Sequence, residues 1–78
     1  MLKQPKALIE LTREEALVFF EWISRFNKRE DADFEDQAEQ RVLWDIEATL
    51  ESTLDDLFSP DYAALLAAAR AKVRDSEE

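Results

Sequence analysis

Two groups of carboxylates are the residues of this chain whose spacing could support chemistry. Glu47, Glu51 and Asp55 recur every four residues, so on a helix they form one acidic row. Paired carboxylates act as general acids and bases, or they hold metal ions beside Glu-x-x-His motifs on neighbouring helices. The chain contains no histidine. We therefore expect this row to be a solvated face, with a metal or small-ligand site as the alternative.

A second acidic group, at residues 31–36, resembles the beginning of a calcium-binding loop because oxygen-bearing side chains recur at alternate positions. An EF-hand loop that begins at Asp31 needs glycine at its sixth position and glutamate at its twelfth. This sequence has Asp36 and Val42 there. We expect no metal ion and no cofactor, and the acidic 31–36 segment belongs to the alternative, ligand-binding interpretation.

Composition excludes several classes of protein. The 78 residues include no cysteine and no glycine, which excludes disulfides, thiolate nucleophiles and glycine-rich phosphate loops. No serine has a visible base partner, so nucleophilic catalysis has no support. The longest apolar run, residues 62–69, is shorter than the roughly 20 residues of a membrane span. We expect a single cytoplasmic domain over residues 1–78, without membrane contact and without enzymatic activity.

The net charge of −9 is unevenly distributed. Residues 30–61 contain twelve acidic side chains and one basic one, Arg41. This excess disfavours contact with nucleic-acid phosphates, which requires Lys and Arg, and it suits either solubility or a basic protein surface. A nucleic-acid-linked regulator is a further hypothesis, because Arg25, Lys28 and Arg29 form a compact basic patch, but the overall charge opposes it. We expect no nucleic acid to bind.

Capping signals predict three helices, at about residues 13–27, 34–58 and 60–75. Thr12 and Glu15 form a capping box at the start of the first helix. Asp33 is the expected N-cap of the second helix and Ser59 that of the third. Pro60 cannot continue the second helix but suits the first position of the third.

The apolar residues of the first two helices fall on one face each. The face of the first helix is rich in aromatic side chains, which we expect in the core: Ala16, Phe19, Phe20, Trp22, Ile23 and Phe26. The core-facing stripe of the second helix consists of Val42, Leu43, Ile46, Leu50, Thr53, Leu54 and Leu57. We expect an all-α, three-helix bundle-like domain in which the long 34–58 helix is the central element.

Residues 7–11 alternate between the two sides of an extended chain, and they leave three interpretations: a strand, an extended arm or part of a helix. No other segment reads as a strand partner, and a lone strand leaves its backbone groups unpaired. We favour an N-terminal extended arm that lies across the helices over a strand exchanged with a second copy.

Trp44 lies about 160° from Ile46 on the helical wheel, outside the core-facing stripe. Tryptophan is enriched at binding hot spots, although the arm or the third helix could instead cover this residue. The interface candidates are Trp44, Ala48, Glu51, Ile9 and Leu11. A two-fold dimer would cover both Trp44 and the apolar arm residues Ile9 and Leu11, so we expect a homodimer.

Residues 15–27 (EALVFFEWISRFN) and 34–47 (FEDQAEQRVLWDIE) resemble a group of small uncharacterised bacterial proteins. The resemblance implies a small soluble helical protein, and it brings no activity, ligand or catalytic residue with it. The residues themselves favour a small, acidic, non-enzymatic protein–protein interaction module that self-associates.

Overall fold

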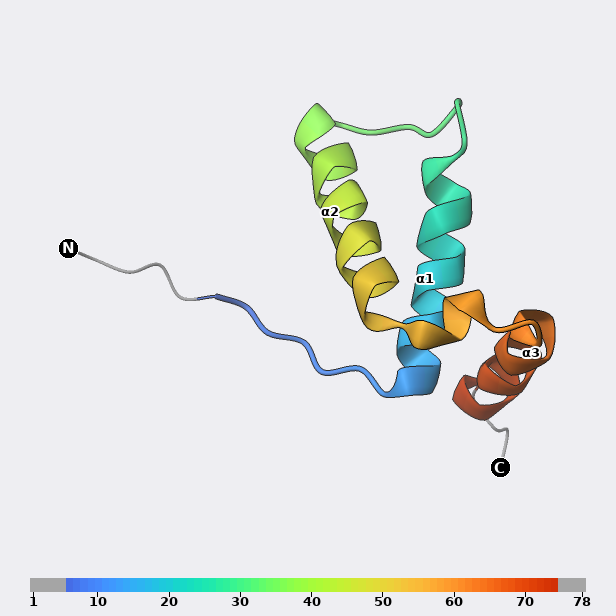
Figure 1. Cartoon of the computed structure of the whole chain (residues 1–78). Coiled ribbons are helices and arrows are strands. Elements are labelled where there is room, and N and C mark those ends of the chain that lie inside the picture. The colour runs from blue at the N-terminus through green and yellow to red at the C-terminus, as the bar shows by residue number, and fades with distance from the viewer. Residues whose placement is uncertain (1–5, 75–78) are drawn as a thin grey trace.

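The computed structural model describes residues 6–74 and contains three α-helices and one short 3-10 helix. These are α1 (Arg13–Asn27), α2 (Gln37–Thr53), η1 (Asp55–Phe58) and α3 (Tyr62–Val73). α1 and α2 run antiparallel, and α3 lies beside the opposite end of α1 from the α1–α2 loop (Figure 1). No strand occurs among the described residues. The predicted all-α, three-helix fold is therefore confirmed.

The capping box at the start of α1 forms as predicted. The Thr12 hydroxyl accepts a hydrogen bond from the Glu15 amide at 3.0 Å, and the Glu15 carboxylate accepts one from the Thr12 amide at 2.8 Å. Two of the backbone donors at the helix start are thus satisfied by neighbouring side chains. α1 has the expected bounds, residues 13–27.

The structure places α1, rather than the 34–58 segment, between the other two helices, because α1 packs against both α2 and α3. Leu17 and Ile23 of α1 are almost completely buried. The core cluster joins α1 to α3 and to Leu54, the residue between α2 and η1, and it consists of Ala16, Leu17, Leu54, Leu66 and Ala69. Leu17 lies outside the stripe that the sequence predicts, because a helix with two neighbours buries a wider arc than a helix with one. The small side chain of Ala69 lets α3 approach α1 closely at this point.

The second helix begins later than predicted. Asp36, not Asp33, is the N-cap of α2, and its carboxylate accepts a hydrogen bond from the Ala38 amide at 2.7 Å. The Glu39 carboxylate accepts one from the Glu35 amide at 3.0 Å. These two contacts satisfy backbone donors around the start of the helix.

The prediction of one continuous helix to residue 58 is wrong, because α2 ends at Thr53. The hydroxyls of Ser52 and Thr53 both donate to the Thr49 carbonyl, at 2.9 and 2.8 Å, and such bonds compete with the helical backbone ladder. Leu54 is extended, with φ −96° and ψ 108°, and is buried in the core. The break turns Leu54 inward and starts η1, in which Asp56 is also buried.

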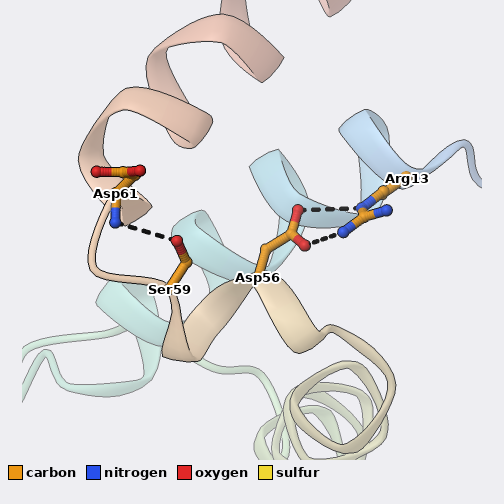
Figure 2. Close-up of polar contacts among 4 residues, drawn as sticks. All are labelled: Arg13, Asp56, Ser59 and Asp61. Atoms are coloured by element: carbon orange, nitrogen blue, oxygen red, sulfur yellow. Dashed lines mark hydrogen bonds and ion pairs between the residues drawn. The ribbon is translucent and has the colours of Figure 1, made fainter.

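Figure 2 shows how η1 is held against α1. The Asp56 carboxylate accepts hydrogen bonds from Nε of Arg13 at 3.0 Å and from Nη2 of the same residue. Ser59 was the expected N-cap of α3, but that position belongs to Asp61. Ser59 instead accepts a hydrogen bond from the Asp61 amide at 3.0 Å. α3 begins at Tyr62, so the predicted start at Pro60 is wrong, and it ends at Val73, with Arg74 as its C-cap. Asp75, the predicted end, lies outside the described residues.

The described part of the N-terminal arm, residues 6–11, has neither helix nor strand. It leaves the lower end of α1 and runs away from the helices (Figure 1). Leu8 is 88% exposed and Ile9 is 83% exposed. Of the three interpretations of residues 7–11, the structure has the extended arm, but this arm does not lie across the helices as expected.

Candidate functional site

The aromatic side chains of α1 form a continuous row that reaches into the α1–α2 loop. The Phe19 and Trp22 rings have centroids 6.4 Å apart, and the Trp22 and Phe26 rings are stacked at 5.0 Å. Phe34, in the loop, meets Phe26 edge to face at 5.8 Å. The row follows from the i, i+3 and i+4 spacing of these residues, which places them on one side of the helix.

The end of this row is an open groove of about 470 Å³ between α1 and α2. We call it the aromatic groove. It is lined by the apolar residues Trp22, Phe26, Phe34, Val42 and Leu43 and by the acidic residues Asp33 and Glu39. Trp22 is 43% exposed and Val42 is 54% exposed. The expectation that Trp22 belongs to the core is therefore wrong, because α2 covers only part of the aromatic face of α1.

α2 exposes apolar side chains on more than one side. None of its 17 residues is buried, and the stripe residues Leu43, Ile46 and Leu50 are only half-buried. Trp44 is 41% exposed. A helix that packs on a folded domain ordinarily buries one stripe of its surface, so α2 is incompletely covered by its own chain.

The interface residues expected from the sequence do not form one continuous patch within a single copy. Trp44, Ala48 and Glu51 are all exposed on α2. Leu11 lies beside Ala16 and Leu54, where it lines a shallow hollow at the lower end of α1. Ile9 is farther along the arm and is almost fully exposed, so it does not cover Trp44.

The acidic row proposed as an alternative ligand site is broken in the structure. Glu47 is half-buried, and its carboxylate accepts a hydrogen bond from the Asn27 side-chain amide at 2.7 Å. Glu51 is exposed on α2, whereas Asp55 belongs to η1, after the extended residue Leu54. The three carboxylates therefore do not continue along one helix as the row requires.

The acidic 31–36 segment uses several of its carboxylates in local contacts. Asp31 pairs with Arg29 at 3.1 Å, and this hydrogen bond lowers the pKa of the Asp31 carboxyl. Asp36 caps α2. Asp33 lines the aromatic groove. Among residues 6–74, no three His, Cys, Asp or Glu side chains are grouped so as to hold a metal ion.

The basic patch expected at Arg25, Lys28 and Arg29 is also partly paired. Arg25 lies 3.7 Å from Glu21, one helical turn before it. The guanidinium of Arg29 lies over the Phe26 ring, 5.6 Å from its centroid, while it also contacts Asp31. Two of the three cations thus have acidic partners within their own chain.

Two hydrogen-bonded contacts link α1 to η1 and α3, beside an ion pair between Lys72 and Glu14 at 3.7 Å. The hydrogen bonds from Arg13 lower the pKa of the Asp56 carboxyl, although burial of this carboxyl opposes the shift. The same hydrogen bonds raise the pKa of the Arg13 guanidinium. The Tyr62 hydroxyl donates to the Glu21 carboxylate at 2.8 Å. Burial, together with this hydrogen bond and the negative charge of Glu21, raises the pKa of Tyr62 to about 12. Both contacts fix helix positions, and neither lies in the aromatic groove.

The aromatic groove is the feature that the sequence did not reveal as a surface. The sequence does contain a pattern that indicates this groove. The predicted apolar face of α1 spans an arc of about 160°, which is wider than the stripe of roughly 100° that an ordinary amphipathic helix buries. We assigned the whole arc to the core. The structure covers the part of this arc around Ala16 and Ile23 and leaves the part around Trp22 open.

None of the helices in the described part of the chain is long and apolar enough to cross a membrane. Comparisons of the chain with models of protein families, with curated proteins and with solved structures found no match.

Proposed function

We propose that the protein is a small, non-enzymatic protein–protein interaction module that self-associates. The observation that carries this proposal is the exposure of α2, a helix of 17 residues with no buried side chain. Its sequence contains an apolar stripe, yet its own chain covers that stripe only in part. An apolar surface of this kind ordinarily marks an interaction site.

The exposed face around Trp44 is suited to protein contact. Tryptophan contributes a large apolar area at interfaces, and it is over-represented among hot spots. One turn further along, the small side chain of Ala48 leaves room for a partner backbone or helix to approach. Glu51 follows three residues later and supplies a polar rim. We therefore assign Trp44, Ala48 and Glu51 to the contact surface.

A second copy of the chain is the proposed partner. In a two-fold dimer the same surface meets its own copy, so one arrangement covers the exposed α2 residues of both protomers. The net charge of −9 opposes this association through general repulsion. We expect the apolar contacts to outweigh it, and we expect added salt to strengthen the dimer by screening the repulsion.

Sedimentation equilibrium of the wild type and of Trp44→Ala tests this function. We expect a wild-type dimer, and we expect Trp44→Ala to weaken association by at least about 2 kcal/mol, the size of a hot-spot effect. Phe58→Ala is the matched control, because Phe58 is an aromatic residue that is 80% exposed on η1. This control should leave association unchanged.

Circular dichroism separates loss of association from loss of fold. Trp44→Ala should retain nearly all of the wild-type helix signal. Ala48→Arg is a second variant on the same face, and it should weaken association through added bulk and charge without removing any buried side chain. A wild type that stays monomeric at high concentration would disprove self-association.

A further inference from the structure

We propose that the N-terminal arm of one copy, residues 6–11, docks in the aromatic groove of a second copy, so that the two protomers exchange arms. This inference rests on the proposed self-association and names an additional contact between the two protomers. Two described features of the chain lack a partner within it. One is an extended apolar segment, and the other is an open apolar groove.

The arm is too short to fill the groove of its own chain. Leu8 is four residues before Thr12, and a fully extended chain of that length spans about 14 Å. Phe26 is fourteen residues after Thr12 on α1, and the helix carries it about 21 Å away. Leu8 and Ile9 therefore stop short of the Phe26 end of the groove in their own chain, whereas the arm of a second molecule meets no such limit of length.

Two-fold symmetry brings the arm and the groove together. The arm leaves the N-terminal end of α1, whereas Phe26 and Phe34 lie at the other end, beside the α1–α2 loop (Figure 1). When the α2 helices of two copies pair antiparallel about a two-fold axis, the arm end of each copy comes beside the loop end of the other. The arm also extends toward the side of the molecule on which α2 lies (Figure 1).

The arm and the groove are chemically complementary. Leu8 and Ile9 present aliphatic side chains, and the groove offers the rings of Trp22, Phe26 and Phe34. The groove has a volume of about 470 Å³, within the range of roughly 300–1,000 Å³ that is typical of ligand pockets. Burial of these apolar surfaces against each other supplies the attraction.

Charge orients the arm within the groove. Lys6 is the only basic residue of the arm segment 6–11. Asp33 and Glu39 line the groove, and residues 30–36 contain five carboxylates and no basic side chain. Lys6 is thus the part of the arm that this acidic rim attracts, and Glu10 is the part that it repels.

The first test measures the dimer dissociation constant by sedimentation equilibrium for one arm variant and one groove variant. Leu8→Asp/Ile9→Asp introduces two charges at positions that are almost fully exposed in the monomer. Val42→Glu introduces one charge at the exposed edge of the groove. Each should raise the dissociation constant at least about tenfold, as expected for lost hot-spot contacts. Phe58→Asp, an equally exposed apolar residue outside both surfaces, is the control and should have little effect.

The second test mixes the arm variant with the groove variant. Neither variant alone has an intact arm–groove contact. In a mixed dimer, however, the normal arm of the Val42→Glu copy meets the normal groove of the Leu8→Asp/Ile9→Asp copy. The mixture should therefore associate more tightly than either variant alone. An independent charge reversal should act similarly: Lys6→Glu should weaken association a few-fold, and adding Asp33→Lys should restore it.

The outcomes separate this inference from the proposed function. A wild-type monomer overturns both. A wild-type dimer that is unaffected by Leu8→Asp/Ile9→Asp overturns arm exchange and leaves self-association in place. If both variants weaken the dimer but their mixture is no tighter than either one, the arm and the groove do not meet across the dimer, and arm exchange is overturned.

Discussion

The Asp56 carboxylate accepts two hydrogen bonds from the Arg13 guanidinium, and so joins residues that lie 43 positions apart in the chain. Arg13 begins α1, and Asp56 lies in η1, just after the point where α2 ends. Bidentate contacts of this kind are stronger than single hydrogen bonds and fix the geometry of both partners. Asp56 is buried while most of the Arg13 side chain is exposed. The pair therefore holds η1, and with it Leu54, against the start of α1.

Asp56→Asn should destabilise the fold, because it replaces one of the two acceptor oxygens by an NH2 donor and removes the negative charge that faces Arg13. The hydrogen bonds lower the pKa of Asp56 in the folded state. A lowered pKa means that the stabilisation is present above the pKa of an unfolded aspartate, about 3.9, and is lost as the pH falls through the folded-state pKa. The difference in melting temperature between the wild type and Asp56→Asn should thus be constant near neutral pH and should shrink below about pH 4.

Asp55→Asn is the matched control for this measurement. It removes the same charge one residue earlier, but Asp55 is exposed and makes no hydrogen bond with Arg13 among the described contacts. Its melting temperature should stay close to that of the wild type. Equal losses for Asp55→Asn and Asp56→Asn would mean that only the general charge of η1 matters, and that the bidentate contact does not.

Tyr62→Phe should lower the free energy of unfolding by about 1 kcal/mol, the usual net contribution of one hydrogen bond. The variant removes the hydroxyl that donates to Glu21 at 2.8 Å and leaves the ring that packs on the core cluster. Chemical denaturation of the wild type and the variant measures this difference. Tyr62→Ala is a useful comparison, because it also removes the ring and should cost more.

The pKa of Tyr62 provides a second measurement on the same contact. Tyr62 is the only tyrosine of the chain, so a phenolate absorbance titration reports on it alone. We expect a pKa of about 12 in the folded protein, against about 10 in an unfolded chain. A raised pKa stabilises the fold fully below pH 10, and this contribution is lost as the pH rises toward 12. Glu21→Gln should move the pKa down toward 10, and an unchanged pKa would contradict the role of Glu21.

Sequence reasoning succeeded where the signal is local. The Thr12–Glu15 capping box specifies the start of α1 through contacts within four residues, and α1 has its predicted bounds. At the start of α2, several acidic residues can each serve as an N-cap, so local chemistry does not choose among them. We selected Asp33, and the structure uses Asp36. The choice depends on the path of the loop that carries Phe34 to Phe26, which is a tertiary contact.

The aromatic face of α1 shows a second limit. Its periodicity correctly marks the residues as one face, but periodicity does not say how much of that face a neighbour covers. α3 approaches near Leu17, and α2 approaches near Asn27, whose side-chain amide contacts Glu47. Neither helix fully covers Trp22 and Phe26, so these two residues line the aromatic groove. The helical periodicity that predicts the fold therefore does not distinguish core residues from candidate interface residues.

The end of α2 at Thr53 is the clearest case in which packing overrode the sequence pattern, and it yields a sharp prediction. Leu54 and Phe58 are both large apolar residues in the stretch that we expected to be helical, yet Leu54 is buried and Phe58 is 80% exposed. Leu54→Ala should lower the free energy of unfolding by about 3 kcal/mol, because it removes a side chain from the core cluster and leaves a cavity. Phe58→Ala should change it by less than about 0.5 kcal/mol, as is usual for surface positions. Thermal or chemical denaturation measures both. A continuous helix to residue 58 would place these residues about 40° apart on one face and would predict comparable losses, so equal effects of the two variants would contradict the inward turn at Leu54.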